Sequence, residues 1–220
     1  MIIFNHHHTL TILEQFLPIN PIIVEAGAFN GTDTKKMALK WSQGTIHAFE
    51  PVPEIYERLI KNTHDQHNVQ CYPYALSDIN GTALFYVSEN PKNPGLASQA
   101  GSLHKPKERL NVSPLIFPRT ITVNTITLPA WAAQHNITHI DLLWLDTQGH
   151  ERAILQAAQS LLNNIHAVLA EVSFIESYYD QPTLSNLVSW MEQQGFEHVG
   201  SDFDNATKNF FGNVLFIRKK

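Results

Sequence analysis

Strand-like and helix-like segments alternate along most of this chain, and that alternation constrains its fold more than any other feature of the sequence. Short apolar runs, many of them β-branched, occur at 22–24, 45–49, 69–74, 140–145 and 167–172. Segments with helix-forming residues or helical apolar spacing separate most of them, at 34–41, 53–63 and 149–162. Because consecutive parallel strands need a crossover connection, this order predicts a mostly parallel, doubly wound α/β sheet with helices on both faces.

Both ends of the chain, and a stretch in the middle, depart from this alternation. Apolar spacing predicts a short N-terminal helix at 9–17, and a strand at 120–124 precedes expected helices at 129–136 and 183–194. Asn80-Gly81 is a turn signal, so we expect the run 82–87 to return antiparallel to the segment before it. The last two strand candidates, 197–201 and 213–218, flank the turn-rich 202–212 with no helix between them. They therefore predict an antiparallel C-terminal hairpin.

Residues 90–119 form a proline-rich insertion in this pattern. The segment holds five prolines and five of the 15 basic residues. A connection of about 30 residues is long for a compact domain, and such loops are usually lids, binding loops or disordered. Two interpretations are open: a mobile surface insertion, or a partly ordered cover over an active site.

Composition excludes several classes of protein. A chain of 220 residues with 43% hydrophobic residues predicts one domain, 1–220, with a substantial core. The net charge of −5 argues against a nucleic-acid partner, because phosphate binding needs clustered Lys and Arg. The single cysteine, Cys71, cannot form an intrachain disulfide, and no apolar run is long enough to span a membrane. We therefore expect a cytoplasmic protein without a membrane partner.

The most informative motif follows the first strand and reads Glu25-Ala26-Gly27-Ala28-Phe29-Asn30-Gly31. A dinucleotide-binding turn would read G-x-G-x-x-G, whereas this turn reads E-x-G-x-x-x-G with Ala28 at the middle glycine position. An acid beside the turn repels a pyrophosphate and attracts an ammonium group. The motif therefore indicates a cofactor with an amino-acid end, although two glycines also occur in ordinary strand-helix turns.

Two further elements follow the next two strands. Glu50-Pro51 lies at the end of the second strand, 23 residues after Gly27, where nucleotide-binding folds place an acid that accepts hydrogen bonds from ribose hydroxyls. Ala75-Leu76-Ser77-Asp78 follows the third strand, in a position suited to an adenine ring. Taken alone, the Ser77-Asp78 part of that element is also typical of a simple turn.

A fourth element, Asp146-Thr147-Gln148-Gly149-His150-Glu151, ends the most apolar strand. The carboxyl end of a core strand faces the ligand crevice, so Asp146 is a candidate site residue, and Glu171 ends the following strand in the same way. Glu151 is either part of the site or a helix cap, since its charge suits a helix N-terminus. A ring of acids in one crevice costs stability through repulsion, which favours a functional interpretation.

Together these elements resemble the FkbM family of S-adenosylmethionine (SAM)-dependent methyltransferases. The elements that carry the resemblance are Glu25-x-Gly27-x-x-x-Gly31, Phe49-Glu50-Pro51, Ala75-x-Ser77-Asp78 with Gly81, and Asp146-x-x-Gly149-x-Glu151, in which Leu145 replaces the Ile of the family's pattern. The resemblance implies a Rossmann-like, seven-stranded sheet with an antiparallel final strand, SAM as methyl donor, and transfer to a hydroxyl oxygen of a small-molecule acceptor. The acceptor itself and the oligomeric state stay open.

The prediction assigns each site residue a role. A hydroxyl acceptor must lose a proton, so we expect a general base near the methyl group. Asp146 is the first candidate, His150 the second, and Glu171 orients the acceptor or shares the proton; a surface position of His150 on its helix is the alternative. We predict no metal site, although Asp146 and Glu171 are oxygen ligands of the kind that Mg²⁺ binds. The residues predicted to bind SAM are Glu25, Gly27, Ala28, Phe29, Asn30, Gly31, Glu50, Pro51, Ala75, Leu76, Ser77 and Asp146.

Two other functions are compatible with parts of this pattern. A nicotinamide-dependent oxidoreductase would also use Glu50, but Ala28 interrupts the glycine triplet that it needs. A non-catalytic SAM-binding module would keep the cofactor half of the site without the base.

Overall fold

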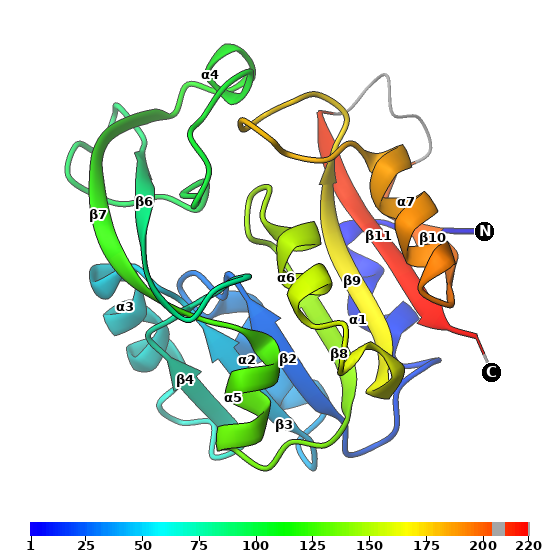
Figure 1. Cartoon of the computed structure of the whole chain (residues 1–220). Helices are drawn as coiled ribbons and strands as arrows, with labels where there is room; N and C mark the ends of the chain where they lie inside the picture. The colour runs from blue at the N-terminus through cyan, green and yellow to red at the C-terminus, as the bar shows by residue number, and fades with distance from the viewer. Residues whose placement is uncertain (204–209, 220) are drawn as a thin grey trace.

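An eight-stranded, mostly parallel sheet forms the centre of the computed structural model, which describes residues 1–203 and 210–219 (Figure 1). The strand order is β1-β10-β11-β9-β8-β2-β3-β4. Only β11 runs against its neighbours, pairing antiparallel with both β9 and β10. The strands are β1 (Ile2–Ile3), β2 (Ile22–Ala26), β3 (Thr45–Phe49), β4 (Val69–Tyr72), β8 (Ile140–Leu145), β9 (Ile165–Ser173), β10 (Phe196–Ser201) and β11 (Phe211–Arg218).

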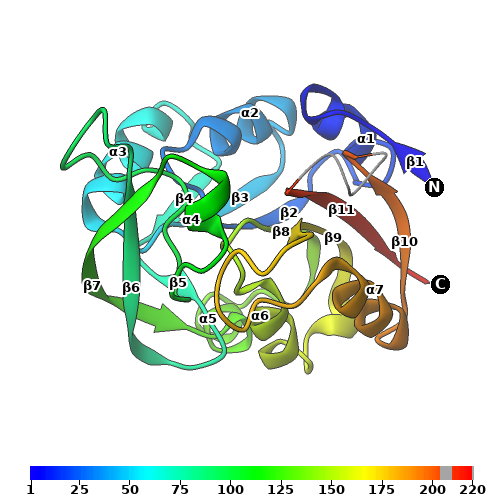
Figure 2. The same cartoon turned by 90° about the horizontal axis from the view of Figure 1, so that it is seen from above.

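Helices cover both faces of this sheet (Figure 2). The helices α1 (Thr9–Leu13), α2 (Thr32–Lys40) and α3 (Pro53–Thr63) lie on one face, and α5 (Leu128–Gln134), α6 (Glu151–Ala157) and α7 (Leu184–Gln193) lie on the other. Adjacent residues of a strand point to opposite faces, so β3 buries Ile46 against the α2 side and Phe49 against the α5 side. The predicted doubly wound α/β class, with its antiparallel C-terminal hairpin, is confirmed.

A second, three-stranded sheet rises beside the β4 edge, in the order β5-β7-β6. It consists of β5 (Ala75–Leu76), β6 (Gly81–Glu89) and β7 (Ile116–Ile126), and the segment between β6 and β7 contains the short helix α4 (Arg109–Val112). Its apolar face packs on the start of α3 through Val52 and Ile55. This small sheet therefore forms a wall above one end of the main sheet.

The main sheet differs from the prediction at its edge and at the N-terminus. It has eight strands and not seven, because Ile2 and Ile3 add a short parallel strand beside β10. The helix expected at 9–17 ends at Leu13, and residues 14–16 continue as turns before Pro18. The 3-10 helices His6–His8 and Leu162–Asn164 were not predicted. The turn-rich 202–212 falls partly outside the described residues, at 204–209.

Three other expectations change in detail. Strand β6 runs antiparallel to β5, as expected, but the two strands do not pair with each other. The long β7 lies between them and pairs with β6 over most of its length and with β5 at two positions. The expected strand at 69–74 ends at Tyr72. The helix expected at 149–162 begins at Glu151, after Gly149 at φ +105°, and ends at Ala157.

The connections of β2 and β8 create a crevice between these two neighbouring strands. The chain leaves β2 toward β3 on one side and leaves β8 toward β9 on the other. Where parallel strands diverge in this way, their carboxyl ends leave an opening in which ligands bind. Residues of the motifs that follow β2, β3, β4 and β8 line the pockets at this opening.

Candidate active site

The turn after β2 joins three strands at the crevice. Gly27 adopts φ +84°, and the backbone N–H groups of Gly27 and Ala28 both donate to the carbonyl of Phe49, at 3.1 and 2.9 Å. The N–H of Asp146 donates to the carbonyl of Ala26 at 3.0 Å. A Cβ atom on Gly27 would lie 1.9 Å from the carbonyl oxygen of Asp146. Only glycine fits this crossing of the β2 and β8 connections.

The second glycine of the motif lies where two helices pack together. Gly31 is the N-cap of α2 at φ +80°, and a Cβ atom there would lie 2.8 Å from Leu59 of α3. It therefore allows α2 and α3 to pack closely and does not line either of the two pockets described below. The side-chain oxygen of Asn30 accepts hydrogen bonds from the backbone N–H and the hydroxyl of Thr32 at the first turn of α2.

Glu25 and Glu50 are buried acids on neighbouring strands. Glu25 is 3% exposed and accepts a hydrogen bond from the Thr34 hydroxyl at 2.5 Å, and burial raises its pKa to about 8. Glu50 accepts hydrogen bonds from the N–H groups of Phe29 (3.1 Å) and Val52 (2.9 Å). Burial also raises the pKa of Glu50 to about 8. Both carboxyl groups are thus held in places where a cationic or hydrogen-bond-donating ligand would stabilise their charged form.

An apolar pocket with about 590 Å³ of empty space opens beside Glu50. Its walls come from the β3–α3 turn, from β5 and β6, from the β8–α6 turn, and from the segment between β6 and β7. The predicted site residues that line it are Gly27, Phe29, Glu50, Pro51, Ala75, Leu76, Asp146 and His150. Ser77 does not line it, and its hydroxyl lies 3.1 Å from Nε2 of His150 behind the wall.

A polar pocket of about 1190 Å³ adjoins the apolar pocket and shares Gly27, Phe29, Gln99 and Asp146 with it. The predicted residues that line it are Glu25, Gly27, Ala28, Phe29, Asn30, Asp146 and Glu171. The two pockets therefore meet at the Gly27–Asp146 crossing, and the acids of four neighbouring strands surround one continuous region.

Gln148 links the two acids that end β8 and β9. Its amide nitrogen donates to Asp146 Oδ1 at 2.8 Å and to Glu171 Oε2 at 2.6 Å. Its amide oxygen lies 3.0 Å from the hydroxyl of Tyr178, which also contacts the carbonyl of Ala100 at 2.7 Å. Burial, together with the neighbouring Asp146 and Glu151, raises the pKa of Glu171 well above its ordinary value. This arrangement holds two carboxyl groups at one end of the polar pocket.

The structure distinguishes Glu151 from the other acids. Its carboxylate accepts hydrogen bonds from the N–H groups of Thr147 (2.9 Å) and Gly149 (3.1 Å) and from the Thr147 hydroxyl (3.0 Å). It lines neither pocket. Its charge stands at the first residue of α6, as the helix-cap interpretation expects, but the N–H groups that it binds belong to the turn before the helix. Its contacts therefore hold the β8–α6 turn.

His150 is buried, with 8% of its surface exposed, so the alternative of a surface position on its helix is wrong. Its Nδ1 lies 2.9 Å from Nε2 of His104, and its Nε2 contacts Ser77 on the other side. Burial and the neighbouring His104 lower the pKa of His150 to about 4, and burial also lowers the pKa of His104. A neutral pair of imidazoles thus joins the segment between β6 and β7 to the start of α6.

This pair predicts acid sensitivity. Between about pH 4 and 6.5 the unfolded chain binds a proton at His150 that the folded protein does not bind, so stability falls as the pH drops through that window. Between pH 7 and pH 4.5 the free energy of unfolding should fall in both proteins. We expect the fall to be smaller in the His150→Gln variant than in the wild type, by on the order of 2–3 kcal/mol. Urea unfolding at both pH values measures this difference. The exposed His139→Gln variant is the control, and equal losses in all three proteins would contradict the prediction.

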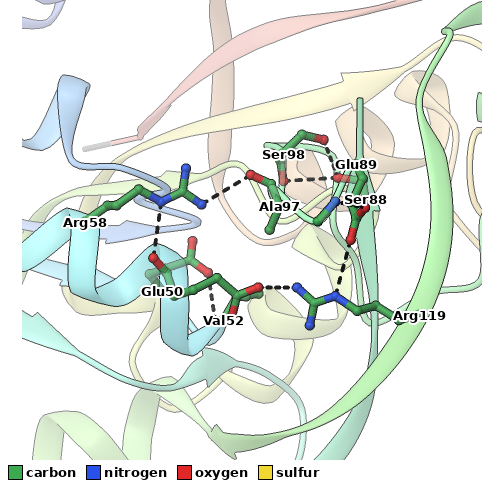
Figure 3. Close-up of polar contacts among 10 residues, drawn as sticks. Glu50, Val52, Arg58, Ser88, Glu89, Ala97, Ser98 and Arg119 are labelled. Carbon is green, nitrogen blue, oxygen red and sulfur yellow. Dashed lines mark hydrogen bonds and ion pairs between the residues drawn. The ribbon is translucent and has the colours of Figure 1, made fainter. Parts of the chain in front are cut away.

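The segment between β6 and β7 covers the apolar pocket. Ser98, Gln99, Gly101 and Leu103 line that pocket, and the Ser102 hydroxyl donates to the carbonyl of Gln148 at 2.7 Å. In Figure 3, Arg58 reaches the carbonyl of Ala97, Ser88 contacts Ser98, and Arg119 reaches Glu89. Arg119 also pairs with Glu54 of α3. The structure therefore places this segment over the apolar pocket, with contacts to α3 and β6. His104 contacts His150, whereas Lys105 is exposed on the outside.

Sequence reasoning missed site residues from this cover, from the β8–α6 turn and from the β9–α7 loop. Arg109, Gln99, Gln148 and Tyr178 all line or support the polar pocket, yet none stands at a spacing that indicates a ligand. Only Gln148 lies inside a recognised motif.

Within residues 1–203 and 210–219, no group of three or more His, Cys, Asp or Glu side chains is placed to hold a metal ion. In the same residues, no helix has the length and apolarity needed to cross a membrane.

Comparison with solved structures supports the fold. A methyltransferase FkbM from Methylobacillus flagellatus superposes with a TM-score of 0.54 at 10% identity, covering 90% of this chain and 44% of that one. The magnesium protoporphyrin IX methyltransferase ChlM from Synechocystis, solved with bound SAM, has a TM-score of 0.53 at 10% identity and covers 96% of this chain and 75% of that one. At these identities the likeness concerns the fold alone.

Comparison of sequences identifies the family. The 2-O-methyltransferase NoeI of Sinorhizobium fredii is 26% identical over 177 residues, which are 80% of this chain and 72% of that protein. The family model for the methyltransferase FkbM domain matches the sequence over residues 25–198. This range begins at Glu25 of the first motif and includes Glu50, Asp146 and Glu171. The chain therefore belongs to the FkbM family of methyltransferases.

Proposed function

We propose that this methyltransferase uses SAM to methylate a hydroxyl oxygen of a small-molecule acceptor. The observation that carries the proposal is the meeting of the two pockets at the Gly27–Asp146 crossing, with Glu50 on one side and Glu25 and Glu171 on the other. The pockets are lined mainly by apolar and acidic groups, which suits a small cationic donor better than a nucleic acid.

The residues present fit SAM. Glu50 lies where a ribose would donate its hydroxyl hydrogens, and the apolar walls that include Ala75, Leu76 and Phe85 suit an adenine ring. Glu25 lies in the polar pocket beside Gly27, where its buried carboxyl group would pair with the donor's ammonium. Gly27 lines both pockets and lets the β2 and β8 connections cross closely between these two places. When bound, SAM supplies an electrophilic methyl group on a sulfonium.

The acids at the ends of β8 and β9 would serve the acceptor. Methyl transfer from a sulfonium is an in-line displacement, so the enzyme must chiefly align the reacting atoms. We assign the general base to Asp146, which lines both pockets and therefore reaches the junction between donor and acceptor. Gln148 would orient Asp146 and Glu171, and Glu171 would share the proton. His150 lines only the apolar pocket, which favours a positioning role for it over that of the base.

The oxygen specificity rests on chemistry and on one relative. A hydroxyl nucleophile needs a base, and this pocket contains two linked carboxyl groups. The relative NoeI is named as a 2-O-methyltransferase, which agrees with a hydroxyl acceptor here.

Calorimetry tests the donor site. We expect SAM and its product S-adenosylhomocysteine to bind at pH 7 with release of a proton, because an ammonium beside Glu25 lowers a pKa that burial holds at about 8. The release should decrease at pH 9, where Glu25 already carries its charge. Titrations in buffers of different ionisation enthalpy measure the proton count.

The Glu25→Gln variant should lose this proton release and bind S-adenosylhomocysteine about 10-fold more weakly or worse. NADH provides the comparison for the oxidoreductase alternative. Binding of NADH without binding of S-adenosylhomocysteine would overturn the proposed function.

A further inference from the structure

Arg109 is a buried cation in the polar pocket for which the described residues offer no carboxylate partner. Its side chain is 9% exposed and forms part of the pocket wall. Its Nε atom is buried without a hydrogen-bond partner, and no described carboxylate lies within 4.0 Å of its guanidinium. The nearby Glu171, whose pKa burial raises although the charge of Arg109 opposes that rise, is instead hydrogen-bonded to Gln148. Buried charges are normally paired, so this one calls for an explanation.

The position of Arg109 is set by its backbone and by an aromatic ring. Its N–H donates to the carbonyl of Ser177 at 3.1 Å, and the neighbouring Glu108 N–H donates to the carbonyl of Glu176 at 3.1 Å. The guanidinium carbon lies 5.1 Å from the centre of the Phe211 ring, at the start of β11. The cover segment therefore holds this charge over the ends of β9 and β11.

That position is on the acceptor side of the site. In the order β11-β9-β8-β2-β3, the donor residues Glu25 and Glu50 belong to β2 and to the end of β3, whereas Arg109 lies over β9 and β11. Neighbouring strands are about 4.8 Å apart, so two to three strand spacings separate Arg109 from Glu25, and three to four separate it from Glu50. Asp146, at the end of β8, lies between them. A ligand group that pairs with Arg109 would thus belong to the acceptor.

We infer that the acceptor carries an anionic group, a carboxylate or a phosphate, which pairs with Arg109 while its hydroxyl faces Asp146. This inference rests on the proposed function. A planar guanidinium matches both kinds of oxyanion through paired hydrogen bonds. The anion would neutralise the buried charge, and Phe211 would provide an apolar surface beside it. The acids Asp146 and Glu171 would repel an anion placed elsewhere in the pocket, so the charges also orient the acceptor.

The first test needs no acceptor. An unneutralised buried charge destabilises the empty protein, so the Arg109→Met variant, which removes the charge and keeps an unbranched apolar side chain, should melt at least about 2 °C higher than the wild type. It should bind S-adenosylhomocysteine as the wild type does. A lower melting temperature in Arg109→Met would mean that Arg109 is a structural residue and would overturn the inference.

The second test finds the charge of the product. A metabolite extract is incubated with the enzyme and methyl-labelled SAM, and the labelled product is separated by anion exchange. We expect the label in the retained fraction, a loss of about 10- to 100-fold in kcat/KM with Arg109→Met, and no change with the exposed Lys105→Gln control. Phosphatase treatment distinguishes the two oxyanions, because it releases the label into the neutral fraction only for a phosphate ester.

The outcomes separate this inference from the proposed function. A neutral labelled product, or full activity in Arg109→Met, would overturn the anionic acceptor and leave methyl transfer intact. Failure to bind S-adenosylhomocysteine would instead overturn the proposed donor site, whatever the melting temperature of the Arg109→Met variant.

Discussion

Replacing Gly27 with alanine is expected to abolish binding of S-adenosylhomocysteine and to destabilise the fold by about 3 kcal/mol or more. The added Cβ atom would lie 1.9 Å from the carbonyl oxygen of Asp146, and the residue would keep a φ of +84°. Because the neighbour is backbone and not a flexible side chain, the β2 and β8 connections must move apart. That movement would separate the two halves of the site. Calorimetry and urea unfolding measure both effects.

Gly95→Ala is the matched control for this substitution. Gly95 adopts φ +80°, nearly the same angle, but an added Cβ atom there would meet nothing within 4 Å. It should therefore cost only the backbone strain, about 1–2 kcal/mol, and leave ligand binding unchanged. If Gly27→Ala and Gly95→Ala behaved alike, the close crossing at Asp146 would have no part in cofactor binding.

The Asp146→Asn variant should lose methyl transfer while it keeps the donor site. Asparagine has the same shape, keeps the backbone carbonyl beside Gly27, and still has an oxygen that can accept from Gln148. It cannot accept the acceptor's proton. Loss of a positioned general base typically costs about 10²- to 10⁴-fold in kcat, and we expect a loss in that range. Affinity for S-adenosylhomocysteine should stay within about threefold of the wild type, which corresponds to a change of less than about 1 kcal/mol in binding free energy.

Asp141→Asn provides the control on the same strand. Asp141 lies at the opposite end of β8, where its carboxylate accepts a hydrogen bond from the N–H of Ile22 at 2.8 Å. This variant should be slightly less stable and fully active. If Asp146→Asn kept most of its kcat, Glu171 would become the candidate base. If neither acid mattered, the non-catalytic binding module would be the better interpretation.

The parts of the fold that could be predicted are those with local signals. The sequence predicts β3 and α3 to the residue, because Gly44 precedes a short β-branched run and Glu50-Pro51 separates it from a helix that begins with Pro53. The edge strand β1 could not be predicted, because two isoleucines carry no periodicity. The pairing of β6 with β7 depends on a partner about 40 residues later in the chain, which no turn signal at Asn80-Gly81 can indicate.

The candidate site also has parts that the sequence predicts and parts that only the tertiary structure determines. The sequence by itself determined that Glu25, Glu50 and Asp146 would share one edge, because parallel strands bring their carboxyl ends together wherever the chain alternates between strand and helix. Only the tertiary structure decided how residues 90–119 fold over that edge, how His104 meets His150, and how Arg109 enters the polar pocket. The path of a 30-residue segment follows from contacts with α3, β6 and the β9–α7 loop, and such distant contacts leave no pattern in the local sequence.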